Sequence, residues 1–107
     1  MANNSRIEQI KEFLKKTPED AFLNYALAME YVSLGEEQKV QQILEKLLKD
    51  DPKYFATYYH LAKLYERQED KPQAIATYEA GINMCKQLGE QHALRELQTA
   101  YDELMYD

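Results

Sequence analysis

The sequence is short of the residues that cross-link small proteins or hold metals. It contains one cysteine, Cys85, so an internal disulfide is excluded. Its two histidines, His60 and His92, leave little for a zinc site. These shortages favour a cytoplasmic domain that needs neither a metal nor a cofactor.

Long apolar stretches are also missing. The first residues, Met-Ala-Asn-Asn-Ser-Arg-Ile-Glu, lack the apolar centre of a signal peptide, and nowhere do about 18 apolar residues follow one another. We therefore expect neither secretion by that route nor a membrane span. Only three glycines and three prolines occur in a chain that is 45% hydrophobic, which indicates regular structure with short connections and not disorder.

Positive charge is in deficit. The chain has 13 Lys and Arg against 19 Asp and Glu, a formal net charge of -6. Duplex binding requires clustered cations that displace counterions from phosphates, so a nucleic-acid-binding function is disfavoured. With 107 residues the chain is the size of a single domain.

What the sequence does contain is a repeat with a period of 34 residues. Within the 34-residue unit that begins at Pro18, six residues are identical to those 34 positions later, where about two would be so by chance from ordinary residue frequencies. The pairs are Pro18 and Pro52, Tyr25 and Tyr59, Leu27 and Leu61, Ala28 and Ala62, Tyr31 and Tyr65, and Glu45 and Glu79.

Each repeat predicts two helices, because apolar residues recur at intervals of three and four. No segment alternates as a strand would. The helices are expected at about 5–16, 20–34, 37–49, 54–68, 71–87 and 91–105.

Residues that favour helix ends agree with these ranges. Thr17-Pro18 and Asp51-Pro52 each predict a helix start with an N-cap side chain and a proline at the first helical position. Asp70 with Gln73, and Ser5 with Glu8, predict capped starts of the same kind. Gly35 predicts the end of the second helix.

A 34-residue unit of two helices resembles the tetratricopeptide repeat. The residues that match its pattern are Leu27, Ala28, Tyr31 and Pro52 in the first unit and Tyr58, Leu61, Ala62, Tyr65, Ala74, Tyr78 and Gly81 in the second. The resemblance covers residues 18 to 88. It implies an all-α fold, a right-handed α–α superhelix of two helix hairpins with flanking single helices.

The first unit departs from the family pattern. Asn24 takes the place of a bulky residue, and Val40, Leu44 and Leu47 replace the alanine, the aromatic residue and the small residue. Lys86 stands where the second unit would carry its proline. We expect the second helix of the first unit to pack less tightly than average.

The ends of the chain resemble half units that cap the repeats. Ile10 and Phe13 fall on packing positions of the extended register, and Leu94, Leu97 and Tyr101 do so if three residues are inserted near Gly89. We expect one domain, 1–107, made of an N-terminal half-repeat helix (5–17), repeat 1 (18–52), repeat 2 (53–88) and a C-terminal capping helix (89–107).

The resemblance implies a binding site for a peptide on the concave side, which the first helix of each unit lines. The candidate residues are Phe22, Tyr25, Met29, Tyr59, Lys63 and Arg95. An aromatic and methionine strip with cations at one end suits a segment that carries apolar side chains and an acidic group. The alternative is that neighbouring helices bury this strip as core.

Some members of the family hold the C-terminal carboxylates of chaperones with a clamp of Lys and Asn. The matching positions here carry Tyr25, Met29, Tyr59 and His60, so that clamp is absent. Lys63 and Arg95 could still hold a carboxylate, although cations on helices are more often solvated.

Catalysis has little support in the sequence. His92 and Glu96 could form half of a metal site, but a surface ion pair is the simpler interpretation. Cys85 has no evident activating base and is more typical of a buried small hydrophobe. We therefore predict a non-catalytic adaptor that binds a peptide segment of another protein, as a monomer or weak homodimer.

Two other functions stay open. The first is a structural module that forms homo-oligomers through the same apolar strip or an end helix. The second is an accessory whose activity belongs to its partner.

Overall fold

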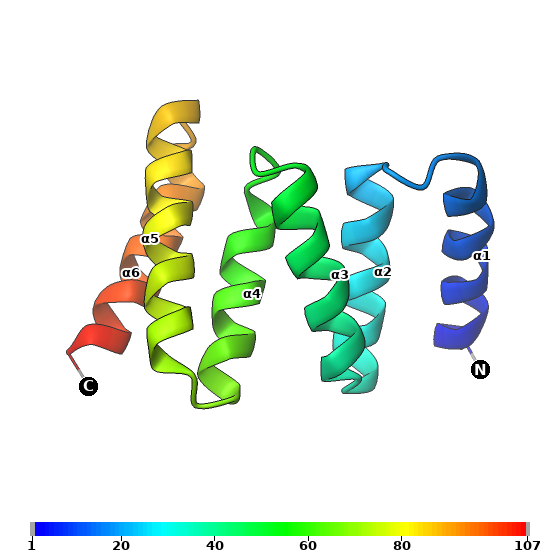
Figure 1. The fold of residues 1–107 in the computed structure, drawn as a ribbon, viewed down its shortest axis with the longest axis horizontal. Helices are drawn as coiled ribbons and strands as arrows, with labels where there is room; N and C mark the ends of the chain where they lie inside the picture. The colour runs from blue at the N-terminus through cyan, green and yellow to red at the C-terminus, as the bar shows by residue number, and fades with distance from the viewer. Residues whose placement is uncertain (1, 107) are drawn as a thin grey trace. The chain divides into compact units, whose positions relative to one another are not determined.

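The computed structural model describes the backbone of residues 2–106 and the side chains of residues 5–106. Its helices are α1 (Ala2–Lys16), α2 (Ala21–Leu34), α3 (Glu37–Asp50), α4 (Ala56–Arg67), α5 (Lys71–Leu88) and α6 (Gln91–Met105) (Figure 1). No strand occurs within residues 2–106. The predicted all-α helical-repeat fold is confirmed. None of the helices within residues 2–106 combines the length and the apolar character that spanning a bilayer requires.

The chain divides into two compact units, residues 1–51 and residues 52–107. Unit 1 contains α1, α2 and α3, and unit 2 contains α4, α5 and α6. The division falls where the sequence predicts the first repeat to end. The single domain and its right-handed superhelical twist stay predictions from the family resemblance.

In unit 1, α2 packs against both α1 and α3. Ala28 is fully buried and Tyr31 is nearly so, which is the arrangement that the repeat pattern predicts. The other buried apolar residues of this unit are Ile7, Ile10, Leu27, Val40, Leu44 and Leu47. Burying one such large apolar side chain contributes about 1.5 to 3 kcal/mol, so this shared core holds the three helices together.

In unit 2, α5 packs against both α4 and α6. Ala62 is fully buried and Tyr65 nearly so, repeating the pair of unit 1. Gly81 of α5 lies so close to α4 that a Cβ added there would come within 2.6 Å of the Tyr58 Cβ. The glycine therefore permits the closest approach of these two helices. The remaining core consists of Thr57, Leu61, Leu64, Ala74, Thr77, Tyr78, Ile82, Cys85, Leu97 and Ala100.

Two helix ends follow the sequence predictions. Gly35 has φ +72° and donates its N–H to the carbonyls of Tyr31 and Val32, as a left-handed C-cap does. The Asp70 side chain accepts a hydrogen bond from the Gln73 N–H at 3.3 Å.

Three predicted helix caps are wrong, although each helix begins within three residues of its predicted start. Asp20 caps α2 by accepting the Leu23 N–H at 2.9 Å, whereas Pro18 lies in a separate turn. Pro52 likewise lies in a turn, and α4 begins after Phe55 without a side-chain cap. Ser5 lies inside α1 and not at its start. In the first two cases the proline lies in a turn before the helix, and its carbonyl accepts a hydrogen bond from a side chain of that helix.

The predicted burial at the ends of the chain is partly wrong. Ile10 is buried, but Phe13 is 62% exposed although the extended register assigns it to packing. In α6, Leu97 is buried and Leu94 and Tyr101 are half-buried, so the helix packs with the face that the shifted register indicates.

Candidate functional site

Three predicted site residues lie together in unit 1. Phe22, Tyr25 and Met29 of α2 are spaced three and four residues apart, so they share one face of the helix. That face borders α1 along a groove, hereafter the α1–α2 groove, which is lined by Arg6, Gln9, Ile10, Phe13, Phe22, Leu23, Tyr25, Ala26, Met29 and Glu30.

The α1–α2 groove is mainly apolar. Phe22 is 65% exposed, and Phe13 on the facing helix is also mostly exposed, while Tyr25 and Met29 are half-buried. The Arg6 Nε and Glu30 Oε2 atoms are 3.4 Å apart and form an ion pair between the two helices. The strip is therefore neither core nor fully exposed, and its two phenylalanines offer apolar surface to a partner.

The other three predicted residues lie together in unit 2. Tyr59 and Lys63 of α4 and Arg95 of α6 line a second groove, hereafter the α4–α6 groove. Its remaining lining residues are His92, Glu96, Thr99, Ala100 and Glu103. This groove is mainly polar, because charged side chains dominate its α6 wall.

Lys63 is held in place by its neighbours. Its Nζ atom lies 5.6 Å from the centroid of the Tyr59 ring and 3.7 Å from Glu66 Oε2. The buried Tyr78 hydroxyl donates to the same Glu66 oxygen at 2.5 Å. Burial, and then this carboxylate, raise the pKa of Tyr78, so the phenol stays protonated and anchors Glu66. The arrangement fixes a cation beside an aromatic ring.

Arg95 is the second cation of this groove. Its side chain is exposed, and within residues 5–106 it has no ion-pair partner. His92 Nε2 lies 3.6 Å from Glu96 Oε2 on the exposed surface of α6, which confirms the predicted surface ion pair whenever the imidazole is protonated. Arg95 therefore has its hydrogen-bond donors available for a ligand.

The remaining candidates do not point to catalysis. Cys85 is buried, as predicted, and burial raises the pKa of its thiol, which disfavours the reactive thiolate. Burial is also the main cause that lowers the pKa of His60, whose ring contacts Tyr59 edge-on with the centroids 5.5 Å apart. Within the side chains that the structure describes, no group of three or more His, Cys, Asp or Glu could hold a metal ion.

Sequence reasoning missed two contributors to these grooves. Phe13 was assigned to packing, yet it lies on the wall of the α1–α2 groove. The Tyr78 hydroxyl of α5 anchors Glu66, which pairs with Lys63 one turn earlier on α4. The i,i+3 spacing of Lys63 and Glu66 on α4 does indicate their ion pair, whereas the exposure of Phe13 and the bond from Tyr78 depend on how neighbouring helices pack.

Comparisons with known proteins agree with this fold. The tetratricopeptide repeat family model matches residues 55–88. A TPR repeat-containing protein of Pseudomonas aeruginosa is 26% identical over 91 residues, which cover 85% of this chain and 87% of that protein.

Solved structures extend the likeness. A tetratricopeptide repeat domain protein from Salinibacter ruber, solved by NMR in solution, is 42% identical with a TM-score of 0.77, covering 81% of this chain and 88% of that one. The TPR2B domain of yeast Sti1, solved in complex with pHsp70, has a TM-score of 0.87 over 98% of this chain and 84% of its own, at 18% identity. The likeness to the Sti1 domain concerns the fold alone. The Salinibacter ruber protein is similar in both sequence and structure over most of both chains. This chain belongs to the tetratricopeptide repeat family.

Proposed function

We propose that this chain is a non-catalytic adaptor that binds a peptide segment of another protein. Tetratricopeptide repeats are generally non-catalytic modules of protein–protein interaction, and the Sti1 domain of similar fold is found in complex with pHsp70. In this proposal the α1–α2 groove takes an apolar side chain of the peptide. The α4–α6 groove takes an acidic group through Lys63 and Arg95.

The observation that carries the proposal is the exposed phenylalanine pair of the α1–α2 groove. Phe13 and Phe22 are each more than 60% exposed, although each would gain about 1.5 to 3 kcal/mol from burial. Two facing aromatic side chains that stay open to water in a folded domain offer a partner an anchor point. For grooves of this size we expect dissociation constants of about 1 µM, which correspond to a binding free energy of about -8 kcal/mol.

The proposal is tested by selecting ligands with the purified chain from a library of random displayed peptides. We expect the selected peptides to share large apolar residues and an acidic residue. Their affinities for wild-type and variant chains are then measured by fluorescence anisotropy. Phe22→Ala should weaken binding of the apolar residues, and Arg95→Gln should weaken binding of peptides that carry the acid.

Two matched controls separate site effects from general ones. Leu88→Ala removes exposed apolar surface outside both grooves, and Lys71→Gln removes one positive charge from the start of α5. Neither should change the affinity. Selected peptides that bind Phe22→Ala and Arg95→Gln as tightly as wild type would refute the proposed grooves.

Self-association is the second candidate, and the same exposed Phe13 and Phe22 favour it. Sedimentation between about 1 and 100 µM separates the two functions, because mass action favours a dimer at high concentration. A chain that remains monomeric at the upper concentration supports the adaptor. A dimer that Phe22→Ala dissociates would instead assign the groove to a second copy.

A further inference from the structure

The two repeats carry different residues at one equivalent position between their two helices. In unit 2, Tyr58 is 3% exposed, and its hydroxyl donates to the Pro52 carbonyl at 2.7 Å. In unit 1 the equivalent residue, 34 positions earlier, is Asn24. Its Nδ2 atom donates to the equivalent Pro18 carbonyl at 3.0 Å. The hydrogen bond is kept, but the aromatic ring is missing.

The missing ring leaves a cavity between α2 and α3. The Asn24 pocket has a volume of about 320 Å³ and is lined by Glu19, Asn24, Gln42, Ile43, Lys46, Leu47, Asp50 and Asp51. Leu47 occupies the position of Gly81 in unit 2, so its side chain refills part of the space that the ring would take. With Ile43 it supplies the pocket's apolar lining.

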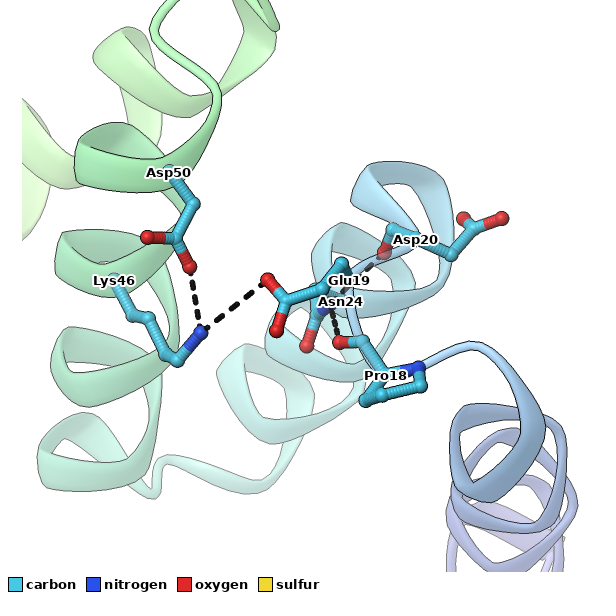
Figure 2. Close-up of polar contacts among 6 residues, drawn as sticks. All are labelled: Pro18, Glu19, Asp20, Asn24, Lys46 and Asp50. Carbon is cyan, nitrogen blue, oxygen red and sulfur yellow. Dashed lines mark hydrogen bonds and ion pairs between the residues drawn. The ribbon is translucent and has the colours of Figure 1, made fainter.

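The polar lining of the Asn24 pocket is organised around Lys46. Figure 2 shows its ammonium between two carboxylates, 2.6 Å from Asp50 Oδ2 and 3.6 Å from Glu19 Oε2. The hydrogen bond from Lys46 is the main cause that lowers the pKa of Asp50, so this carboxylate is ionised at neutral pH. Asp51 adds a third carboxylate, which gives the lining a formal charge of -2.

Unit 2 has no such lining at the matching positions. There, Glu19, Lys46, Asp50 and Asp51 correspond to Lys53, Ala80, Met84 and Cys85. The cavity and its charges therefore occur together in the first repeat, and neither is a general feature of this chain's helix hairpins. An apolar lining beside an excess of negative charge fits a side chain with an aliphatic stem and a cationic head.

We propose that the Asn24 pocket binds an arginine side chain of a partner peptide. The aliphatic stem packs on Ile43 and Leu47, and the guanidinium donates to the Asp50 and Glu19 carboxylates, whose other oxygens stay available beside Lys46. A planar guanidinium can bridge two acceptors at once, which a lysine ammonium does less well. The site lies between α2 and α3, whereas the grooves proposed above lie against α1 and against α6, so this inference does not depend on them.

The test uses N-acetyl-arginine amide as the probe and the ¹⁵N-labelled full chain in NMR titrations near neutral pH. We expect saturable shifts of the Asn24 and Gln42 side-chain amides and of the Leu47–Asp51 backbone, with a dissociation constant in the millimolar range. N-acetyl-citrulline amide has nearly the same shape without the charge, and it should cause no such shifts.

Two variants test the two halves of the pocket. Asn24→Tyr combined with Leu47→Gly installs the residue pair of unit 2 and should abolish the shifts by filling the cavity. Asp50→Asn keeps the size of the side chain and should weaken binding about threefold to tenfold, the loss of one charge-assisted hydrogen bond. Glu12→Gln is the matched control, because Glu12 pairs with Lys15 at 2.7 Å on α1 and its loss changes the net charge equally. It should leave the affinity unchanged.

A free polyamine is the other source of positive charge, and spermidine is titrated alongside. Stronger binding of arginine amide than of spermidine supports the peptide-borne side chain. The proposal is overturned if spermidine binds and arginine amide does not, or if citrulline amide gives equal shifts. It is also overturned if Asp50→Asn and Glu12→Gln bind the probe as wild type does.

Discussion

Unit 1 and unit 2 each contain a helix hairpin of the same kind, but different side chains pack inside the two hairpins. Both bury an alanine and a tyrosine where the two helices of the repeat meet. Around this pair, unit 2 packs the rings of Tyr58 and Tyr78, whose hydroxyls donate hydrogen bonds to acceptors within the unit. Unit 1 has Asn24 and Leu44 at the same positions. The fold tolerates an aliphatic or an aromatic interior. The choice decides where cavities and anchored polar groups appear.

The largest expected effect concerns the Tyr58 and Asn24 positions. Tyr58→Ala should lower the free energy of unfolding by about 3 to 5 kcal/mol, because it empties a buried ring position. Asn24→Ala should cost only about 1 kcal/mol, since it loses hydrogen bonds but little buried volume. Urea unfolding followed by circular dichroism measures both. Equal losses would show that the two positions do not play the different roles assigned here.

Alkaline pH should destabilise unit 2 through its phenols. The pKa values of Tyr58, Tyr78 and Tyr101 are all raised, the first two mainly by burial and the third mainly by its hydrogen bond to Glu79. A raised pKa means that the stabilisation is complete below the unfolded-state pKa near 10 and is lost as pH rises through the folded-state value.

Tyr78→Phe isolates the contribution of one of these phenols. Below pH 10 the variant should lose about 1 to 2 kcal/mol, because Glu66 loses its buried donor. Above pH 10 its stability should fall less steeply than that of wild type. Urea unfolding at several pH values between about 8 and 11 gives both slopes. Parallel slopes would contradict the role given to the Tyr78 hydroxyl.

The two proposed grooves should respond differently to salt. Raising the salt concentration from about 0.05 to 0.5 M should weaken the binding of acidic peptides, because it screens Lys63 and Arg95. Phe22→Ala should lower the affinity for apolar peptides about tenfold and leave that salt dependence unchanged. Isothermal titration calorimetry at the two salt concentrations measures both effects. A salt dependence that disappears in Phe22→Ala would mean that the grooves do not divide the ligand as proposed.

The smallest expected loss of stability should be equal in the two units and concerns the glycines that end α2 and α5. Gly35 and Gly89 end α2 and α5 with φ near +72° and +73°, and neither has an atom within 4 Å of an added Cβ. Gly35→Ala and Gly89→Ala should therefore each cost about 1 kcal/mol through backbone strain alone. Thermal unfolding measures the pair. A clear difference between them would indicate a packing role for one glycine.

Much of the fold could be predicted because it is repeated and local. The 34-residue period is visible when one unit is compared with the next. The apolar spacing and the Gly35 and Asp70 caps depend on neighbours in sequence, and the structure confirms the helices that they predict. The helix starts at Pro18 and Pro52 were wrong because a proline suits a turn before a helix as well as its first turn. Each proline carbonyl accepts a hydrogen bond from the side chain six residues later, a contact that the helix-capping patterns do not include.

The sequence predicted which helix faces the candidate residues share, but not that these residues line one mainly apolar groove and one mainly polar groove. Spacing places Phe22, Tyr25 and Met29 on one face, yet only the position of α1 leaves Phe22 exposed and Tyr25 half-buried. The ion pair of Lys63 with Glu66 follows from their i,i+3 spacing on α4, whereas the bond from Tyr78 to Glu66 depends on the packing of α5 against α4. The departure at Asn24 was visible in the sequence, but the cavity beside it was not.

Peptide binding in the two grooves is tested most directly by NMR, by mapping a selected peptide that carries both apolar and acidic residues onto the ¹⁵N-labelled chain. We expect the shifted signals to belong to residues of the α1–α2 and α4–α6 grooves, Phe22 and Tyr59 among them. Replacing the acid of the peptide by its amide should reduce the shifts around Lys63 and Arg95 only. Shifts confined to other surfaces, with both grooves unchanged, would contradict this expectation.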